Sequence, residues 1–152
     1  MPVERLISGG QTGADQGGLA AAVTLGMATG GWAPHDWQTE DGPSPWLAEY
    51  GLVEHSGGYR ARTRSNVADS DATVIFGDAT SPGSRLTLST CMDMDKPYFC
   101  VKWPGNDKSV EVAKWLLDYD VRVLNAAGNR ESKNPGIFEA SKLFFISAMW
   151  ML

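Results

Sequence analysis

Short apolar runs alternate with amphipathic stretches along this chain, and the alternation predicts strands separated by helices. Residues 72–76 form the clearest strand pattern, because they are apolar or β-branched and lie between Asp71 and Gly77. Further strands are expected at residues 5–7, 30–33, 97–101 and 121–124. The sequence therefore predicts one α/β domain over residues 1–152. Its expected core is a Rossmann-like open, mainly parallel sheet of about five strands with helices on both faces.

Helical periodicity follows each expected strand, and Gly, Pro and Asn residues mark the helix ends. Helices are expected from about Thr12 to Gly26, over residues 59–69, from about Ser84, after Asn106–Asp107 and after Asn134–Pro135. Their core faces are expected at Leu19, Ala22 and Val23, at Leu88, Cys91 and Met92, at Val110, Ala113 and Leu117, and at Ile137, Ser141, Phe144, Phe145 and Ala148.

The first helix carries two unusual features. Thr12 and Asp15 have capping-box spacing, with Asp in place of the usual Glu. Gly17 and Gly18 lie inside the helix, where glycine is unfavourable, so they indicate a close approach to the sheet or to a ligand.

Residues 35–58 show no clear period and are rich in Gly and Pro, which predicts a flap over a site or an excursion along a sheet edge. His35 and His55 lie in this segment without a base partner and are expected on the surface. Trp32 and Trp37 are expected to flank a pocket, where they could stack on a ring.

Three of the expected strands run into small, polar loops, at residues 8–13, 78–84 and 126–130. In an open parallel sheet these loops meet at the carboxyl edge, where ligands bind. Glycines allow close backbone approach, and the N–H groups of a helix N-terminus attract anions. The loops therefore predict a site for a phosphate-bearing small molecule.

The first loop matches neither the P-loop, since no Lys follows it, nor G-x-G-x-x-G, since Ser8 replaces the first Gly.

Composition and charge narrow the class of protein. The formal net charge is -5, which argues against general nucleic-acid binding but leaves room for a local basic pocket. Cys91 and Cys100 have no metal-like spacing and are expected as two buried thiols. There is no signal-peptide pattern and no apolar run that could span a membrane, so we expect a cytoplasmic protein without membrane partners.

Residues 7–15 read I-S-G-G-Q-T-G-A-D, which closely resembles the opening signature of the molybdenum cofactor carrier proteins. The similarity continues through residues 30–34, 40–42, 62–63, 66–67, 69–73, 124–132 and 135–137. That family is related to the SLOG group of Rossmann-like proteins, which includes the Lonely Guy phosphoribohydrolases. The resemblance implies that fold, and a nucleotide or nucleotide-like ligand at the Gly-rich loops.

The chain departs from these relatives at several positions, including residues 35–38, where the carrier family tends to have basic residues. Lonely Guy enzymes carry P-G-G-x-G-T-x-x-E, and residues 82–90 match it with Thr90 in place of the catalytic Glu. Thr87 keeps the hydroxyl of the motif, and Arg62 matches its catalytic Arg. Asn129 replaces a Pro common in the last loop of the carrier family and is expected only to loosen that turn.

Arg62, Arg64 and Asp15 are charged residues that could face the predicted site. Arg62 and Arg64 are two residues apart and cannot share one helix face, so at most one is expected to point into the site. Asp15 is expected as a helix cap, with a metal or a ribose hydroxyl as the alternative. No catalytic motif or metal set is visible. The expected ligand-binding residues are Ser8, Gly9, Gly10, Gln11, Thr12, Gly13, Asp15, Arg62, Asn66, Ser81, Gly83, Ser84, Thr87, Gly128 and Arg130.

These observations favour a binding or carrier protein for a phosphorylated small molecule, with the molybdenum cofactor (molybdopterin) and a nucleotide both open as its ligand. One alternative is a nucleotide hydrolase or phosphoribohydrolase of the SLOG kind, with Arg62, Asp15 and Glu131 as its polar residues. Another is a nucleotide-signal sensor module whose ligand tunes assembly. A homo-oligomer, either a dimer or a tetramer, is expected.

Overall fold

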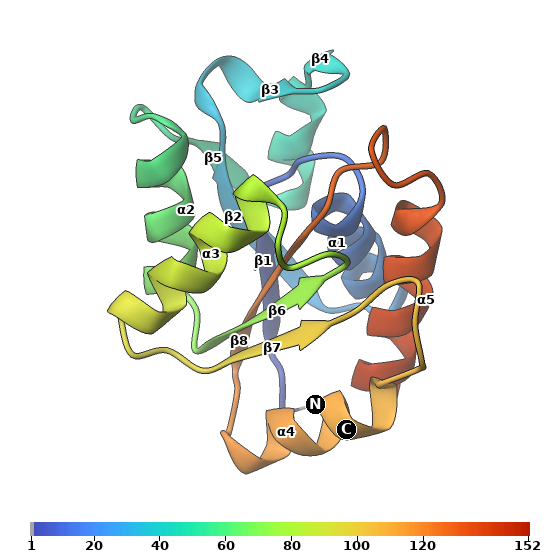
Figure 1. Ribbon diagram of the computed structural model, residues 1–152. Coiled ribbons are helices and arrows are strands. Elements are labelled where there is room, and N and C mark those ends of the chain that lie inside the picture. Colours follow the sequence, from blue (N-terminus) through green and yellow to red (C-terminus); the bar gives the residue numbers. More distant parts are fainter. Residues whose placement is uncertain (1) are drawn as a thin grey trace.

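The computed structural model describes residues 2–152. Its centre is a parallel sheet with the strand order β5-β2-β1-β8-β6-β7 (Figure 1). The strands are β1 (Arg5–Ser8), β2 (Ala28–Ala33), β5 (Leu52–Glu54), β6 (Ala72–Phe76), β7 (Tyr98–Val101) and β8 (Val123–Gly128). The predicted α/β Rossmann-like fold is confirmed.

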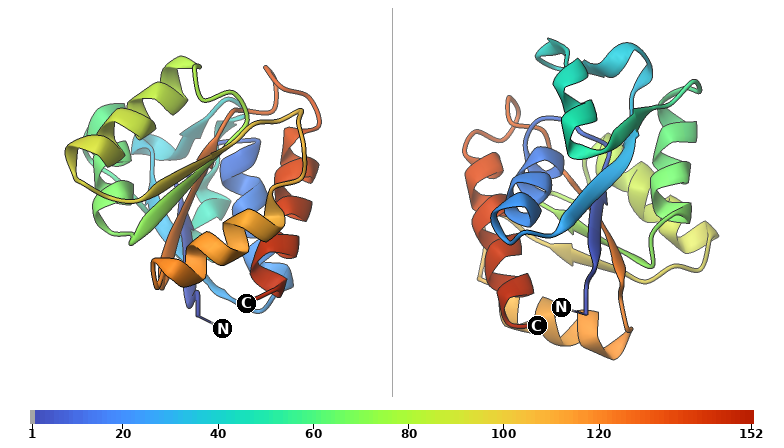
Figure 2. Two further views of the ribbon diagram at one scale, coloured as in Figure 1. Left: turned by 60° about the horizontal axis from the view of Figure 1, so that its bottom comes forward. Right: turned by 180° about the vertical axis from the view of Figure 1, so that it is seen from behind.

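Five helices cover the two faces of this sheet. They are α1 (Ala14–Thr24), α2 (Tyr59–Ala68), α3 (Pro82–Asp93), α4 (Ser109–Asp118) and α5 (Ile137–Trp150). Helices α2 and α3 pack together on one face, and α5 packs against both α1 and α4 on the other (Figures 1 and 2). None of these helices is long and apolar enough to cross a membrane, as far as residues 2–152 are concerned.

The segment at residues 35–58 accounts for the sixth strand. It contains two 3-10 helices (His35–Trp37 and Pro45–Tyr50), a short hairpin of β3 (Gln38–Thr39) and β4 (Gly42–Pro43), and β5. Strand β5 pairs in parallel with β2, with Gly31 opposite Leu52. The segment is therefore an excursion along the sheet edge. The sequence did not predict β5 because three residues are too few to show a period.

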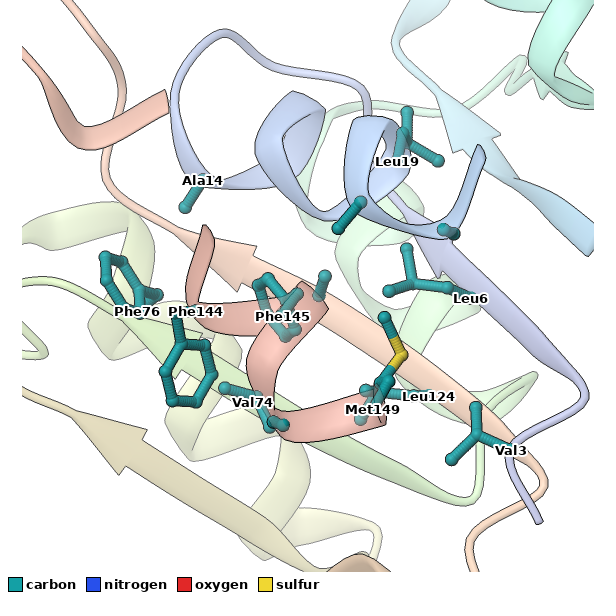
Figure 3. Packing of buried hydrophobic residues seen from close by; sticks show 14 of the residues in the cluster. Val3, Leu6, Ala14, Leu19, Val74, Phe76, Leu124, Phe144, Phe145 and Met149 are labelled. Atoms are coloured by element: carbon teal, nitrogen blue, oxygen red, sulfur yellow. The ribbon is translucent and has the colours of Figure 1, made fainter. Parts of the chain in front are cut away.

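The core lies between the sheet and the layer of α1 and α5. Leu6, Val74 and Leu124 rise from three adjacent strands, and Phe145 and Met149 of α5 close over them (Figure 3). All five side chains are fully buried. The buried face predicted for α5 is confirmed, because its apolar positions repeat with helical spacing over the whole element.

The glycines inside α1 lie where the helix comes closest to its neighbours. A Cβ added at Gly18 would lie 2.5 Å from Cβ of Ala126 in β8. A Cβ at Gly17 would lie 2.0 Å from Oγ of Ser141 and 2.8 Å from the carbonyl oxygen of Phe138, both in α5. The close approach predicted from these glycines is confirmed, with the sheet on one side and α5 on the other.

The core faces predicted for α3 and α4 were only partly correct, because Cys91 and Ala113 are buried as expected but other predicted positions are exposed. Met92 is 57% exposed, and Val110 and Leu117 are 63% and 51% exposed. The residues that α3 buries are largely polar, Ser84, Thr87 and Thr90 together with Cys91, while α4 buries Val112, Ala113 and Leu116. An apolar pattern could not find the inner face of α3, because hydroxyl groups dominate it. Val23 in the first helix is likewise 52% exposed rather than buried, and of the two cysteines expected to be buried, Cys91 is buried but Cys100 is exposed.

The predicted helix starts also need correction. Helix α1 begins after Gly13 without a side-chain cap, so Thr12 and Asp15 do not form a capping box. Helix α5 begins after Gly136, two residues beyond the predicted Asn134–Pro135 start. Its first N–H groups are instead bound by the Glu131 carboxylate, which accepts hydrogen bonds from Gly136 N (2.7 Å) and Phe138 N (2.9 Å).

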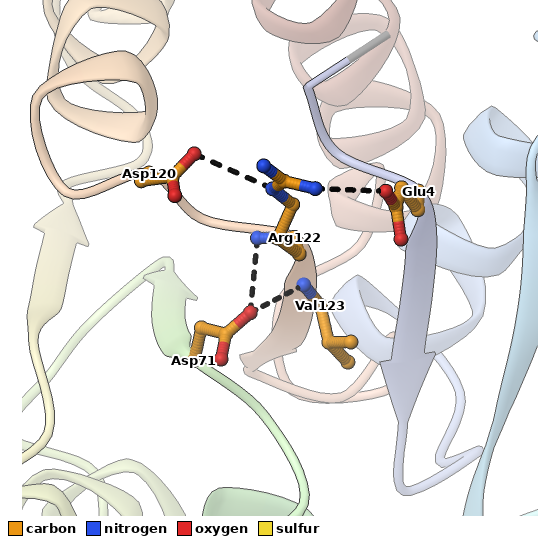
Figure 4. Close-up of polar contacts among 5 residues, drawn as sticks. All are labelled: Glu4, Asp71, Asp120, Arg122 and Val123. Atoms are coloured by element: carbon orange, nitrogen blue, oxygen red, sulfur yellow. Dashed lines mark hydrogen bonds and ion pairs between the residues drawn. The ribbon is translucent and has the colours of Figure 1, made fainter.

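At the amino edge of the sheet, polar contacts align three strands (Figure 4). The Asp71 carboxylate, just before β6, accepts hydrogen bonds from Arg122 N (2.9 Å) and Val123 N (2.8 Å) at the start of β8. The Arg122 guanidinium pairs with Glu4 before β1 (3.1 Å) and with Asp120 (3.4 Å). Because these ion pairs are exposed, we assign them to alignment more than to stability.

We expect Gly18→Ala to destabilise the fold by about 1–3 kcal/mol despite the higher helix propensity of Ala, because the new methyl group overlaps Ala126. The double variant Gly18→Ala/Ala126→Gly removes that overlap and should be more stable than the sum of the two single changes predicts. Urea unfolding of the four proteins measures the coupling. Purely additive effects would contradict the packing described here.

Candidate functional site

A cavity of about 370 Å³ opens at the carboxyl edge of the sheet, between the ends of β1, β6 and β8 and the helices α2 and α3. This volume is within the range of small-molecule sites. Its lining comprises Gly9, Gln11, Asp15, Tyr59, Arg62, Thr63, Asn66, Ser81, Pro82, Gly83, Ser84, Thr87, Asn125, Ala127, Gly128, Asn129, Arg130, Lys133 and Asn134. All three loops predicted to meet at this edge contribute to the lining.

Arg62 projects from the buried face of α2 into this cavity, and only 5% of the residue is exposed. Its guanidinium packs on Gly9, since a Cβ added there would lie 1.6 Å from Nη1. Its Cζ also lies 4.9 Å from the centre of the Tyr59 ring. Arg64 is exposed, so the prediction that at most one of the two arginines faces the site is confirmed.

The buried charge of Arg62 is incompletely satisfied. Within residues 2–152, its Nε has no hydrogen-bond partner and no carboxylate forms an ion pair with it. Buried polar groups almost always have partners, and a buried charge without one is costly. The guanidinium is therefore prepared to receive an anion.

Asp15 is the one acidic residue that lines the cavity, given the part of the chain that the structure describes. Burial raises the pKa of its carboxyl group from 3.8 to about 6, although the Arg62 charge and hydrogen bonds from the backbone N–H groups of Gln11 and Gly9 act to lower it. The expectation that Asp15 caps the helix is thus replaced: it is a buried acid that faces Arg62 across Gly9.

The N-terminus of α3 forms another wall. Ser81 is its N-cap and accepts a hydrogen bond from Ser84 N (3.4 Å), and Pro82 occupies the first turn. The Thr87 hydroxyl donates to the carbonyl oxygen of Gly83 (3.2 Å). The positive end of the helix dipole therefore lies at the cavity, where it favours negative charge.

Asn129 connects two of the loops that form the cavity. Its Oδ1 accepts a hydrogen bond from Asp78 N (2.5 Å), and its Nδ2 donates to Asp78 O, Ser81 Oγ and Ser84 Oγ at 3.1, 2.9 and 3.2 Å. The prediction that Asn129 loosens its turn was wrong. A side-chain amide offers both a donor and an acceptor, which proline lacks, so Asn129 holds the loop after β8 to the start of α3.

Glu40, in the β3–β4 hairpin, connects the first loop to the segment between β8 and α5. Its carboxylate accepts hydrogen bonds from the hydroxyl of Thr12 and from both the hydroxyl and the N–H of Ser132. Burial acts to raise its pKa, but the bonds from Ser132 and Thr12, with the Arg130 charge, hold that pKa below its ordinary value. The edge segment therefore holds the first loop in place through Glu40, although none of its residues lines the cavity.

Most of the predicted ligand-binding residues line the cavity, and four do not. Ser8 is fully buried at the end of β1, and Gly10 packs under Leu47 and Leu52. Thr12 is engaged by Glu40, and Gly13 packs against the backbone of Asn129 and Glu131. These four shape the first loop. The Asn66 amide lines the cavity but is already bonded to the backbone N–H and carbonyl of Trp32 at 2.8 and 3.1 Å.

Several lining residues were not predicted from the sequence, namely Tyr59, Thr63, Pro82, Asn125, Ala127, Asn129, Lys133 and Asn134. Polar residues at the end of the last strand were the available signal for Asn125 and Asn129. Trp32 and Trp37, which were expected to flank the pocket, do not line the cavity: Trp32 donates to Asp69 and Trp37 packs on the core. Tyr59 is the aromatic residue at the cavity.

The cavity holds no cluster of metal ligands in the described part of the chain. Among residues 2–152, one group of His, Asp and Glu side chains has converging ligand atoms. It consists of His35, Asp36 and Glu54 on the edge segment, none of which lines the cavity. His35 and Asp36 are strongly exposed, and exposed groups of this kind are common without an ion. His55 is only partly exposed: its ring packs edge-on against Trp32 and its Nε2 lies 3.0 Å from Ser65 Oγ.

The fold is that of a Rossmann-like α/β protein. The family model described as "Circularly permutated YpsA SLOG family" (cpYpsA) matches residues 6–149. The chain belongs to this family.

One solved structure supports the same assignment. The chain is similar to a "putative molybdenum carrier protein" from Syntrophus aciditrophicus SB, with 31% sequence identity and a TM-score of 0.88. The similarity covers 97% of this chain and 96% of that one. No curated protein matches the chain with significance. The resemblance seen in the sequence motifs is therefore confirmed at the level of the family.

The raised pKa of Asp15 makes a prediction about stability. A carboxyl group whose pKa is raised by folding favours the folded state below its unfolded pKa, and this contribution is lost as the pH rises through about 6. We expect the unfolding free energy of the wild type to fall by up to about 3 kcal/mol relative to Asp15→Asn between about pH 4 and pH 7.5. Urea unfolding at several pH values measures this. Parallel pH profiles would contradict the assignment.

Proposed function

We propose that this protein binds a phosphate-bearing small molecule in the edge cavity. The observation that carries this proposal is Arg62, a buried cation whose Nε has no partner among residues 2–152. Arginine presents a planar set of donors that matches the oxygens of a phosphate group. A phosphate bound there would satisfy the orphaned donor and neutralise the buried charge.

Other features of the cavity support an anionic ligand. Arg130 and Lys133 line it together with Arg62, against the single carboxylate of Asp15. The protein as a whole has a net charge of -5, so this concentration of positive charge is local. Such a pocket attracts an anionic ligand inside an otherwise acidic protein. The N-terminus of α3 adds its partial positive charge at the same wall.

The remaining surface fits the polar body of a cofactor or nucleotide. Asn125, Thr63 and Thr87 offer amide and hydroxyl groups, and Tyr59 offers an exposed aromatic ring for stacking. A nucleotide and the molybdenum cofactor both combine a phosphate with a flat ring system. The carrier description of the similar protein favours the cofactor, and the SLOG family favours the nucleotide.

The variant Arg62→Met keeps an unbranched side chain and removes the charge, so it should abolish binding. We expect nucleoside monophosphates or molybdopterin to raise the Tm of the wild type and to leave that of Arg62→Met unchanged. The matched control is Arg64→Met, which removes an exposed arginine of the same helix. A full panel without any shift in the folded wild type would overturn the proposal, as would equal binding by Arg62→Met.

A second candidate function is hydrolysis of the ligand, and Asp15 is the observation that favours it. A buried carboxyl group with a pKa of about 6 beside Arg62 has the properties of a general acid or base near neutral pH. The other candidates are engaged elsewhere. Thr90 bonds to the carbonyl oxygen of Leu86 and does not line the cavity, and Glu131 holds the start of α5.

If this second function holds, the protein should release the free base from a nucleoside monophosphate, and Asp15→Asn should lower the rate by about 100-fold or more. Chromatography of the products measures the base directly. Glu131→Gln is the control, and it should affect stability more than turnover. Verified folded protein that releases no base would remove this candidate.

A further inference from the structure

The cavity brings a carboxylate and a guanidinium together at one point. A Cβ placed on Gly9 would lie 1.6 Å from Arg62 Nη1 and 3.0 Å from Asp15 Oδ2. An anion that binds to the Arg62 guanidinium from the cavity therefore comes within reach of the Asp15 carboxylate. Both residues line the cavity and both are more than nine-tenths buried.

A carboxylate is an unusual wall for an anion site, because an ionised acid repels the ligand. The other charged groups that face Asp15 across the cavity are basic: Arg62 from α2, and Arg130 and Lys133 from the connection between β8 and α5. Two further acids do not line the cavity and are engaged elsewhere: Glu40 is bonded to Thr12 and Ser132, and Glu131 to the backbone at the start of α5. A proton shared between Asp15 and the bound anion would remove the repulsion between them.

We propose that Asp15 makes this site selective for an oxyanion that can carry a proton, such as a phosphate monoester, over one that cannot, such as a sulfate, a sulfate ester or a phosphodiester. This inference rests on the proposed function and specifies its ligand class. One proton lies between an Asp15 oxygen and an oxygen of the ligand. The ligand and Asp15 then carry two negative charges between them, which Arg62 offsets together with Arg130 and Lys133 of the same lining.

The chemistry of the two groups is matched. The second ionisation of a phosphate monoester has a pKa of about 6, close to the value for Asp15. A proton shared between groups of similar acidity is held by both, which suits a strong hydrogen bond. A sulfate ester has no such proton, so it would place a bare anion against the Asp15 carboxylate.

Isothermal titration calorimetry with two matched pairs of ligands tests this inference: inorganic phosphate with sulfate, and phenyl phosphate with phenyl sulfate. We expect the wild type to prefer the phosphate of each pair by about tenfold or more near pH 7. Asp15→Asn should bring that ratio towards one, mainly by gaining affinity for the sulfates, since its amide can donate a hydrogen bond to them.

A measurement on the wild type alone guards against a variant that folds poorly. Titrations of phenyl phosphate near pH 7.5, in buffers of different ionisation enthalpy, should show the uptake of up to about one proton per ligand bound. The affinity for phenyl phosphate should fall by up to about tenfold per pH unit above about pH 6.5. Phenyl sulfate should bind more weakly at each pH, because it carries no proton of its own and only Asp15 can take one up.

The outcomes separate this inference from the function beneath it. Equal binding of phosphates and sulfates by the wild type, lost in Arg62→Met, overturns the role of Asp15 and keeps the anion site. A preference for phosphates that Asp15→Asn retains also overturns the role of Asp15, as does phosphate binding without proton uptake. A folded wild type that binds neither member of either pair, nor any phosphorylated compound of the panel, overturns both.

Discussion

The contact between the Arg62 guanidinium and the backbone at Gly9 is the constraint on which the carboxyl edge depends. Any side chain at Gly9 would occupy the space that the guanidinium fills. The arginine in turn has little other room, because α2 packs against both α3 and β2. The burial of this cation without full hydrogen bonding is a cost that an anionic ligand can offset.

Two polar side chains keep the loops around this contact in place. Asn129 joins the loop after β8 to the start of α3, and Glu40 joins the first loop to Ser132. These contacts fix the walls of the cavity through the chain's own side chains. Such preorganisation lowers the entropic cost of the proposed binding. Glu40 also explains why the edge segment matters to the site without touching the cavity.

The chain shares its fold with the cpYpsA SLOG family, but the chemistry of its cavity depends on the side chains that line it. The hydroxyl of Thr90 replaces the carboxylate of the Lonely Guy motif and is bonded to its own helix. The acid at the cavity instead comes from Asp15 of α1. Asp15 lies close to the Arg62 guanidinium at Gly9, and the proposed discrimination among ligands would act at this point.

The sequence by itself predicted the order of the helices and of every strand of the main sheet but β5, because apolar runs mark the strands and Gly, Pro and Asn residues mark the helix ends. It also located the three loops, since parallel strands end at one edge. Only the tertiary structure decided the inner face of α3, the three-residue strand β5 and the partners of Asn129, Glu131 and Asp15. These features depend on contacts between residues far apart in the chain, which the apolar pattern within one element cannot predict. The burial of Arg62 against Gly9 is of the same kind: the sequence showed an arginine on a helix and a glycine in a loop, and the packing of one on the other made a site.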